Sequence, residues 1–105
     1  KMRKEFYECL CTVCQNVFQD YPDENTSFPC LIFDLDYTAA YSLNDIAYFK
    51  QHARVEIFTE TSEERSALEL QLIEKLFEYD WINVSNRSIP DAEYYRQNLT
   101  FERKV

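Results

Sequence analysis

Two aspartates lie two positions apart at the end of an apolar run. Residues 30–35 are CLIFDL and Asp36 follows, so Asp34 and Asp36 mark the place where a strand is expected to run out into a loop. Side chains two positions apart in an extended segment point to the same side. Two carboxylates that face one point repel each other unless a cation neutralises them, and Mg²⁺ takes carboxylate and carbonyl oxygens. The pair therefore indicates a candidate magnesium site.

Hydrophobic patterning predicts the elements that would position these acids. The run 30–35 is continuously apolar, which favours a parallel strand covered on both faces. Thr61 and Glu64 form a capping box that starts a helix, and Ser42 begins a similar S-L-N-D pattern. The full set of expected elements is a helix over 2–20, a connector over 21–29, strands over 30–35, 54–59, 81–85 and 99–103, and helices over 43–52, 62–77 and 91–97.

Strands that alternate with helices at this spacing predict the fold class. Repeated βαβ units form a parallel sheet with right-handed crossovers. We expect one α/β domain over 1–105, with a three-layer, Rossmann-like core over 30–105 and a central parallel sheet. An extra N-terminal helix and a connector over 1–29 precede this core. Ligands bind such sheets at the carboxyl ends of the strands, which is where Asp34 and Asp36 are expected.

Composition argues against several classes of function. The chain has 105 residues, of which 46% are hydrophobic, too many for a disordered segment. Its 11 basic and 19 acidic residues give a net charge of −8, so tight nucleic-acid binding is not expected. No apolar run is long enough for a bilayer, so no membrane partner is expected. The absence of glycine excludes the phosphate loops that need it, and the opening Lys1-Met2 resembles a piece cut from a longer protein.

Cysteines and glycosylation motifs bear on the cellular compartment. Cys9, Cys11 and Cys14 fall within the helical pattern 2–20, which favours free thiols that behave as small hydrophobes. A disulfide, or a zinc site completed by His52, is the alternative. A cytoplasmic or nuclear location is preferred because no signal segment is visible, yet four N-x-[ST] triplets favour the secretory pathway. The triplets begin at Asn25, Asn83, Asn86 and Asn98.

Two segments resemble the first two motifs of the haloacid dehalogenase superfamily. LIFDLDYT, residues 31–38, is similar to a hydrophobic strand followed by D-x-D-x-T. RVEIFTET, residues 54–61, is similar to the second motif, a hydrophobic strand that ends in Thr or Ser. The resemblance covers residues 30–86. DLDYTAAYS is also similar to the branch that dephosphorylates phosphoserine in protein tails, and NRSIPDAEYYRQ is similar to polynucleotide 3′-phosphatases.

The resemblance implies a role for each candidate site residue. Asp34 would be the nucleophile that takes the phosphoryl group, and Asp36 would protonate the leaving oxygen and then activate water. Mg²⁺ would be held by the Asp34 carboxylate and the Asp36 backbone carbonyl. Thr38 and Thr59 would contact the substrate phosphate. For the basic group of the third motif the candidates are Arg87, Arg96 and Lys104.

The chain departs from the family pattern after the second motif. Lys75 lies inside the expected helix 62–77, where it is badly placed for the third motif. No acidic pair that would form the fourth motif follows before Val105, so the family's site is expected to be truncated.

The resemblance implies a magnesium-dependent phosphatase that hydrolyses a phosphomonoester through an aspartyl-phosphate intermediate. Residues 36–54 leave room for one short helix and no cap domain, so large substrates are favoured: a phosphoprotein first, a nucleic-acid end second. The alternative is a catalytically inactive relative that binds a protein partner through the exposed sheet end or the first helix. A third hypothesis is a secreted, glycosylated binding domain.

Overall fold

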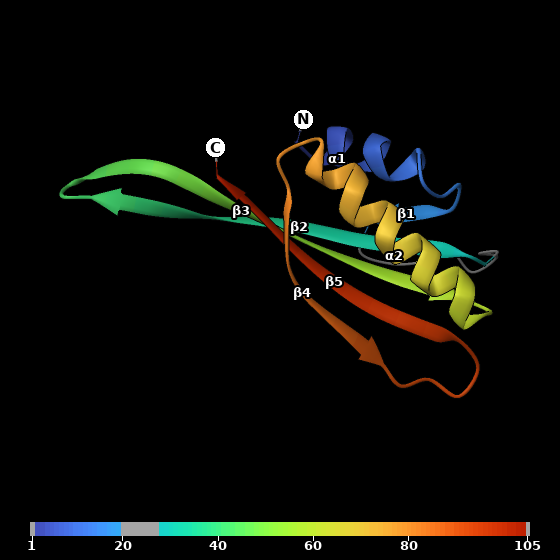
Figure 1. Cartoon of the computed structure of the whole chain (residues 1–105). Coiled ribbons are helices and arrows are strands. Elements are labelled where there is room, and N and C mark those ends of the chain that lie inside the picture. Colours follow the sequence, from blue (N-terminus) through green and yellow to red (C-terminus); the bar gives the residue numbers. More distant parts are fainter. Residues whose placement is uncertain (1, 20–27, 105) are drawn as a thin grey trace.

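The computed structural model describes residues 2–19 and 28–104 (Figure 1). Their strands form one mixed sheet in the order β1-β2-β3-β5-β4. β1 is parallel to β2, and the other neighbouring strands are antiparallel. The elements in chain order are α1 (Met2–Cys11), β1 (Val17–Gln19), β2 (Cys30–Ser42), β3 (Asp45–Thr59), α2 (Ser62–Phe77), β4 (Ile82–Ile89) and β5 (Tyr95–Lys104).

This architecture corrects the expected three-layer, Rossmann-like fold with its central parallel sheet. The sheet is mainly antiparallel, and both helices pack against the same one of its faces. Phe6 of α1 and Leu72 of α2 belong to one core cluster with Phe33 of β2. The domain therefore has two layers. Short connections join β2 to β3 and β4 to β5, as antiparallel neighbours allow, in place of crossover helices.

Strand register separates the two faces of the sheet. On the helix-covered face, buried residues of β2, β3 and β5 lie opposite one another and form the core. Intervening residues such as Asp34 and Arg54 point to the other side, called the open face here, because side chains alternate along a strand. The buried sheet residues of the core are Leu31, Phe33, Leu35, Ala53, Val55, Ile57, Leu99 and Phe101.

The longest helix begins where its capping box predicts and ends where its apolar stripe predicts. Thr61 is the N-cap, and its Oγ1 accepts the backbone N–H of Glu64 at 3.2 Å. The helix then covers Ser62–Phe77, which confirms the expected range 62–77. Its apolar stripe is buried as expected at Leu68, Leu72 and Leu76, although Phe77 is exposed.

Other expected elements need correction. Residues 43–52 form a tight turn and the start of β3, and residues 91–97 form a bend and the start of β5, so neither segment is helical. The N-terminal helix ends at Cys11, and most of the connector 21–29 lies outside the described residues. The expected strands 30–35, 54–59 and 99–103 are parts of much longer observed strands, and 81–85 overlaps β4, which begins at Ile82. Within the described ranges no helix has both the length and the apolarity needed to cross a membrane.

The β2–β3 hairpin extends past the rest of the sheet (Figure 1). In the described residues β5 pairs with β3 as far as Lys104, which lies opposite Lys50. Beyond this pair the hairpin continues as two strands. The segment 37–49, which comprises this extension and the two β2 residues at its base, is called the arm here. The molecule measures 50 × 23 × 23 Å. Its radius of gyration of 14.7 Å exceeds the value of about 13 Å for a compact chain of this length.

Candidate functional site

The two aspartates of the expected site lie on the open face, inside a strand and not at its end. Asp34 lies opposite Arg54 and Asp36 opposite His52 on β3. Together with Thr38 these side chains line a pocket of about 330 Å³. The sequence correctly placed both acids on one side of the chain. The strand continues for six residues beyond Asp36, because it pairs with β3 as far as Ser42.

Asp34 is engaged by Arg54 through both of its carboxylate oxygens. Arg54 Nε donates to Oδ1 at 3.1 Å, and Nη2 donates to Oδ2 at 3.0 Å. This is the bidentate arrangement that fits a guanidinium to a carboxylate. The hydrogen bond to Asp34 is the main reason that the pKa of Arg54 is raised above its ordinary value. For Asp34 to accept a phosphoryl group, the Arg54 side chain would first have to move away.

The remaining polar groups of this pocket are also paired with one another. Thr38 Oγ1 and His52 Nε2 are 3.4 Å apart, and His52 Nδ1 is 3.3 Å from Glu102 Oε1. The second oxygen of Glu102 contacts Lys50 Nζ at 3.3 Å. Cross-strand pairs of opposite charge are a common way to stabilise the solvent-facing side of a sheet. These contacts are therefore explained by the sheet itself.

Thr59 does not join the aspartates. It is fully buried on the helix-covered face, and its Oγ1 donates to the backbone oxygen of Thr61 at 2.7 Å. It lies five positions beyond Arg54 on β3, a separation of about 16 Å along a strand. An odd number of positions also turns its side chain to the opposite face. The structure thus does not bring Thr59 and Asp34 to a common phosphate.

The basic candidates for the third motif also lie apart from Asp34. Arg87 is exposed on β4 opposite Asn98, and the Lys104 ammonium lies 5.1 Å from the centre of the Tyr48 ring. Among the described residues, no hydrogen bond or ion pair joins either of them to Asp34. Arg96, the third candidate, is likewise engaged elsewhere. Thr38 and Asp36 share the open-face pocket with Asp34, and Arg54 is the guanidinium that lines it.

The arrangement does not fit the expected magnesium site. Mg²⁺ requires several oxygen ligands in octahedral geometry. Both Asp34 oxygens accept hydrogen bonds from Arg54. The Asp36 carboxylate is then the remaining acidic metal ligand in the pocket. Across residues 2–19 and 28–104 no group of three or more His, Cys, Asp or Glu side chains could hold a metal ion. No chemical step is therefore routed through Mg²⁺.

The structure places the four cysteines and three of the four asparagines of the N-x-[ST] triplets. All four cysteines are free thiols. Cys9 and Cys14 are buried, as expected of small hydrophobes, whereas Cys11 is exposed and Cys14 lies beyond the end of α1. Burial raises the pKa of the Cys30 thiol to about 11. Asn83 and Asn86 lie within β4 and Asn98 within β5, not in loops, while Asn25 lies outside the described residues.

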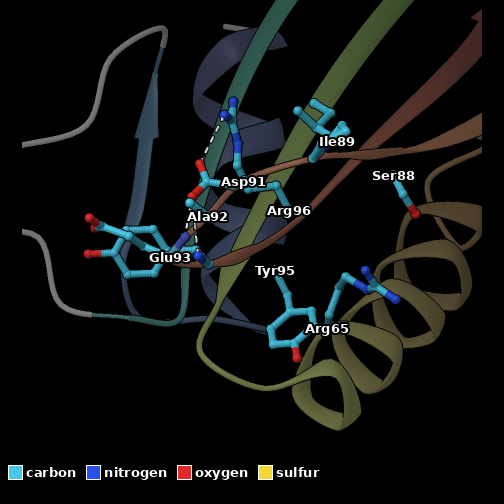
Figure 2. A pocket seen from close by; sticks show the side chains of 10 residues that line it. Arg65, Ser88, Ile89, Asp91, Ala92, Glu93, Tyr95 and Arg96 are labelled. Carbon is cyan, nitrogen blue, oxygen red and sulfur yellow. Dashed lines mark hydrogen bonds and ion pairs between the residues drawn. The ribbon is translucent and has the colours of Figure 1, made fainter.

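A second pocket, of about 430 Å³, lies between α2 and the β4–β5 connection (Figure 2). Asp91 fixes this connection, because its Oδ1 accepts the backbone N–H groups of Glu93 at 2.9 Å and Tyr94 at 3.2 Å. The bond from Glu93 is the main cause that holds the pKa of Asp91 below its ordinary value. Arg96 donates to Asp91 at 3.4 Å and to Glu56 at 2.9 Å. These charges are used to hold the loop in place.

The arm is the feature that the sequence reasoning missed. Tyr37, Tyr41, Leu43, Ile46, Tyr48 and Phe49 are all exposed although they are large and apolar. A strand signal was present in the aromatic and β-branched residues of this segment. The helix-like spacing of Leu43, Ile46, Ala47 and Phe49 obscured that signal.

Comparisons with protein-family models and with curated proteins give no match. The resemblance to the haloacid dehalogenase superfamily therefore depends on the two short motifs alone.

Proposed function

We propose that this chain is a protein-binding module whose docking element is the arm. The observation that carries this proposal is a concentration of exposed apolar side chains at one end of the molecule. Helices α1 and α2 cover the other end of the sheet (Figure 1). Of the thirteen large apolar side chains that are exposed in the described residues, the arm holds six: Tyr37, Tyr41, Leu43, Ile46, Tyr48 and Phe49.

Composition of the arm supports this role. Tyrosine and phenylalanine are enriched in the cores of protein interfaces, where charged residues are depleted. Within residues 37–49 the one charged residue is Asp45, although the whole chain carries a net charge of −8. Large contiguous apolar patches on soluble proteins commonly mark interaction sites.

The arm also continues the apolar face of the core. Tyr37, Ala39 and Tyr41 follow Leu35 in the same alternation on β2, but no helix covers them. The rings of Tyr37 and Phe49 contact edge to face, with centroids 5.7 Å apart. A partner that covered this face would extend the hydrophobic core across the arm.

Site-specific photo-crosslinking tests the proposal. A photoreactive phenylalanine analogue replaces Tyr41 in one variant and Leu70, which is 62% exposed on α2, in a control variant. After irradiation in cells, adducts are mapped by mass spectrometry to the residue attacked on the partner. We expect a defined adduct from position 41 that position 70 does not give. Equal, diffuse labelling from both positions would refute a docking role for the arm.

Phosphatase activity stays a prediction, supported by the two motifs and by the shared pocket of Asp34 and Asp36. It is tested by magnesium-dependent hydrolysis of an aryl phosphate, with Asp34→Asn as the inactivating change. Arg54→Gln is the matched variant, because it frees the Asp34 carboxylate without removing it. Activity that rises in Arg54→Gln and vanishes in Asp34→Asn would support the enzyme, and inertness of all three folded proteins would contradict it.

A further inference from the structure

We infer that the partner of the arm is a second copy of this chain, bound by antiparallel pairing of β2 with β2 about a two-fold axis at Ala39. This inference rests on the proposed function and names the partner of the same surface. The two sheets would join into one continuous sheet, with the helices of both copies on the same side. A two-fold axis normal to the sheet produces this arrangement, because it reverses strand direction and preserves the faces.

The outer edge of β2 is available for such pairing. β1 pairs with β2 at Leu31, Ile32 and Phe33. From Asp34 to Ser42 the described chain places no strand on that edge. Arg3 Nη2 donates to the Leu35 backbone oxygen at 3.5 Å, and beyond Asp36 the outward N–H and C=O groups of alternate residues are not paired with a strand. Exposed edges of this kind are templates for another strand. The open stretch is nine residues long, longer than an average strand of about five or six residues.

Part of this edge lacks the charges and prolines that usually prevent pairing, although the β2–β3 register shifts between Ala40 and Tyr41. Proteins protect edge strands with charges, proline, bulges or short length. The other edge of the sheet, β4, has a register irregularity between Asn83 and Ser85 and carries Arg87. Residues 37–42, by contrast, are YTAAYS, with neither charge nor proline.

The sequence of β2 is self-complementary about Ala39. Antiparallel pairing centred there places Tyr37 opposite Tyr41 of the second copy and Asp36 opposite Ser42. Aromatic pairs directly across strands are favourable, and like charges directly opposite are unfavourable. A centre nearer the body, at Leu35 or Asp36, would oppose aspartates. Electrostatics therefore favours the centre in the uncharged stretch.

Exposed aromatic side chains of β2 contribute area to this contact. Tyr37 and Tyr41 are 66% and 72% exposed, and Tyr48 and Phe49 are 37% and 39% exposed. Tyr48 and Phe49 lie on β3, one strand away from the paired edge. With about 200 Å² for a fully exposed aromatic side chain, Tyr37 and Tyr41 of β2 offer roughly 280 Å² of the ~800 Å² that one partner gives to a standard interface. Leu43 and Ile46 and the strand backbone add to this area.

A charge-exchange experiment tests the two-fold contact. Ala39→Lys and Ala39→Glu each place like charges opposite one another at the axis, whereas Ala39→Thr is a neutral, strand-compatible control. Sedimentation velocity of the wild type and of Ala39→Thr should give twice the 12.7 kDa mass of one chain. Each charged variant should sediment as a monomer, and an equal mixture of the two should recover the dimer.

Each outcome decides a separate point. A monomeric wild type, charged variants that remain dimeric, or a mixture that stays monomeric would overturn the inference. Circular dichroism of each variant shows that it is folded, and recovery in the mixture shows the same independently. If the wild type is monomeric while the crosslinker at Tyr41 attacks a different protein, the inference fails and the proposed function stands. If position 41 also labels no better than Leu70, the proposed function fails as well.

Discussion

The tip of the arm has an unusual backbone conformation at Leu43, and a single substitution there can relieve its strain. Leu43 has a φ of 57°, in the left-handed region, and its side chain is 99% exposed. A residue with a Cβ atom pays roughly 1 kcal/mol for this conformation, whereas asparagine adopts it readily. Replacing Leu43 by asparagine should therefore relieve the strain without removing any packing inside the chain.

We predict that Leu43→Asn has opposite effects on folding and on association. The free energy of unfolding should rise by about 1 kcal/mol, which raises Tm by about 4 °C in a domain of this size. Removal of an apolar side chain from the docking surface should weaken association. If half of a leucine side chain is buried on docking, the loss is about 1 kcal/mol, or roughly fivefold in Kd.

Two measurements on one protein check this prediction. Thermal unfolding is followed at a protein concentration low enough for the monomer, and the dimer Kd comes from sedimentation equilibrium. Leu43→Val is the matched control, because it keeps an apolar side chain that tolerates positive φ less well. It should lower Tm and leave Kd nearly unchanged. A lower Tm for Leu43→Asn, or an unchanged Kd, would refute the reasoning about the tip.

Three further predictions concern the body of the domain. The folded-state pKa of Cys30, about 11, lies above the ordinary 9.0, so its contribution to stability is full below pH 9 and is lost as pH rises toward 11; Cys30→Ala should flatten this alkaline loss in urea unfolding. Asp34→Asn and Arg54→Gln should show a coupling free energy below about 1 kcal/mol in a double-mutant cycle, because the pair is exposed. Thr61→Ala should lower the free energy of unfolding by about 1 kcal/mol, because α2 loses its N-cap.

Controls and contrary outcomes differ among these three. Cys11→Ala, at an exposed thiol, should leave the alkaline slope unchanged, and an unchanged slope in Cys30→Ala would show that another group causes it. A coupling above about 2 kcal/mol would mean that the Asp34–Arg54 pair is far stronger than an exposed ion pair. Ser66→Ala, inside α2, should not destabilise the domain; a loss equal to that of Thr61→Ala would remove the capping explanation.

Local signals predicted the elements whose causes are local. The capping box located α2, because Thr61 and Glu64 interact three positions apart on one chain. Residues 43–52 could not be assigned in this way, because their fate depends on pairing with β2. A glycine-containing turn is the usual sequence signal of a hairpin. Here Leu43 and Asn44 form the turn instead. The wrong fold class followed from expecting helices at 43–52 and 91–97, where the chain instead connects antiparallel strands, β2 to β3 and β4 to β5.

The same distinction applies to the candidate site. Alternation along β2 sufficed to place Asp34 and Asp36 on one side. The partner of Asp34 could not be foreseen, because Arg54 reaches it through strand register, 20 positions later in the sequence. The antiparallel register places the end of β3, with Thr59, beside the beginning of β2, whereas the parallel sheet expected from the sequence would have brought the carboxyl ends of the strands together.

Hydrogen–deuterium exchange at two protein concentrations tests the central claim most directly. The alternate backbone amides of β2 between Tyr37 and Ser42 that face its outer edge should exchange slowly when the protein is concentrated and faster after a roughly hundredfold dilution. Amides in the middle of α2 should show little change by comparison. Exchange along β2 that is independent of concentration would contradict the account.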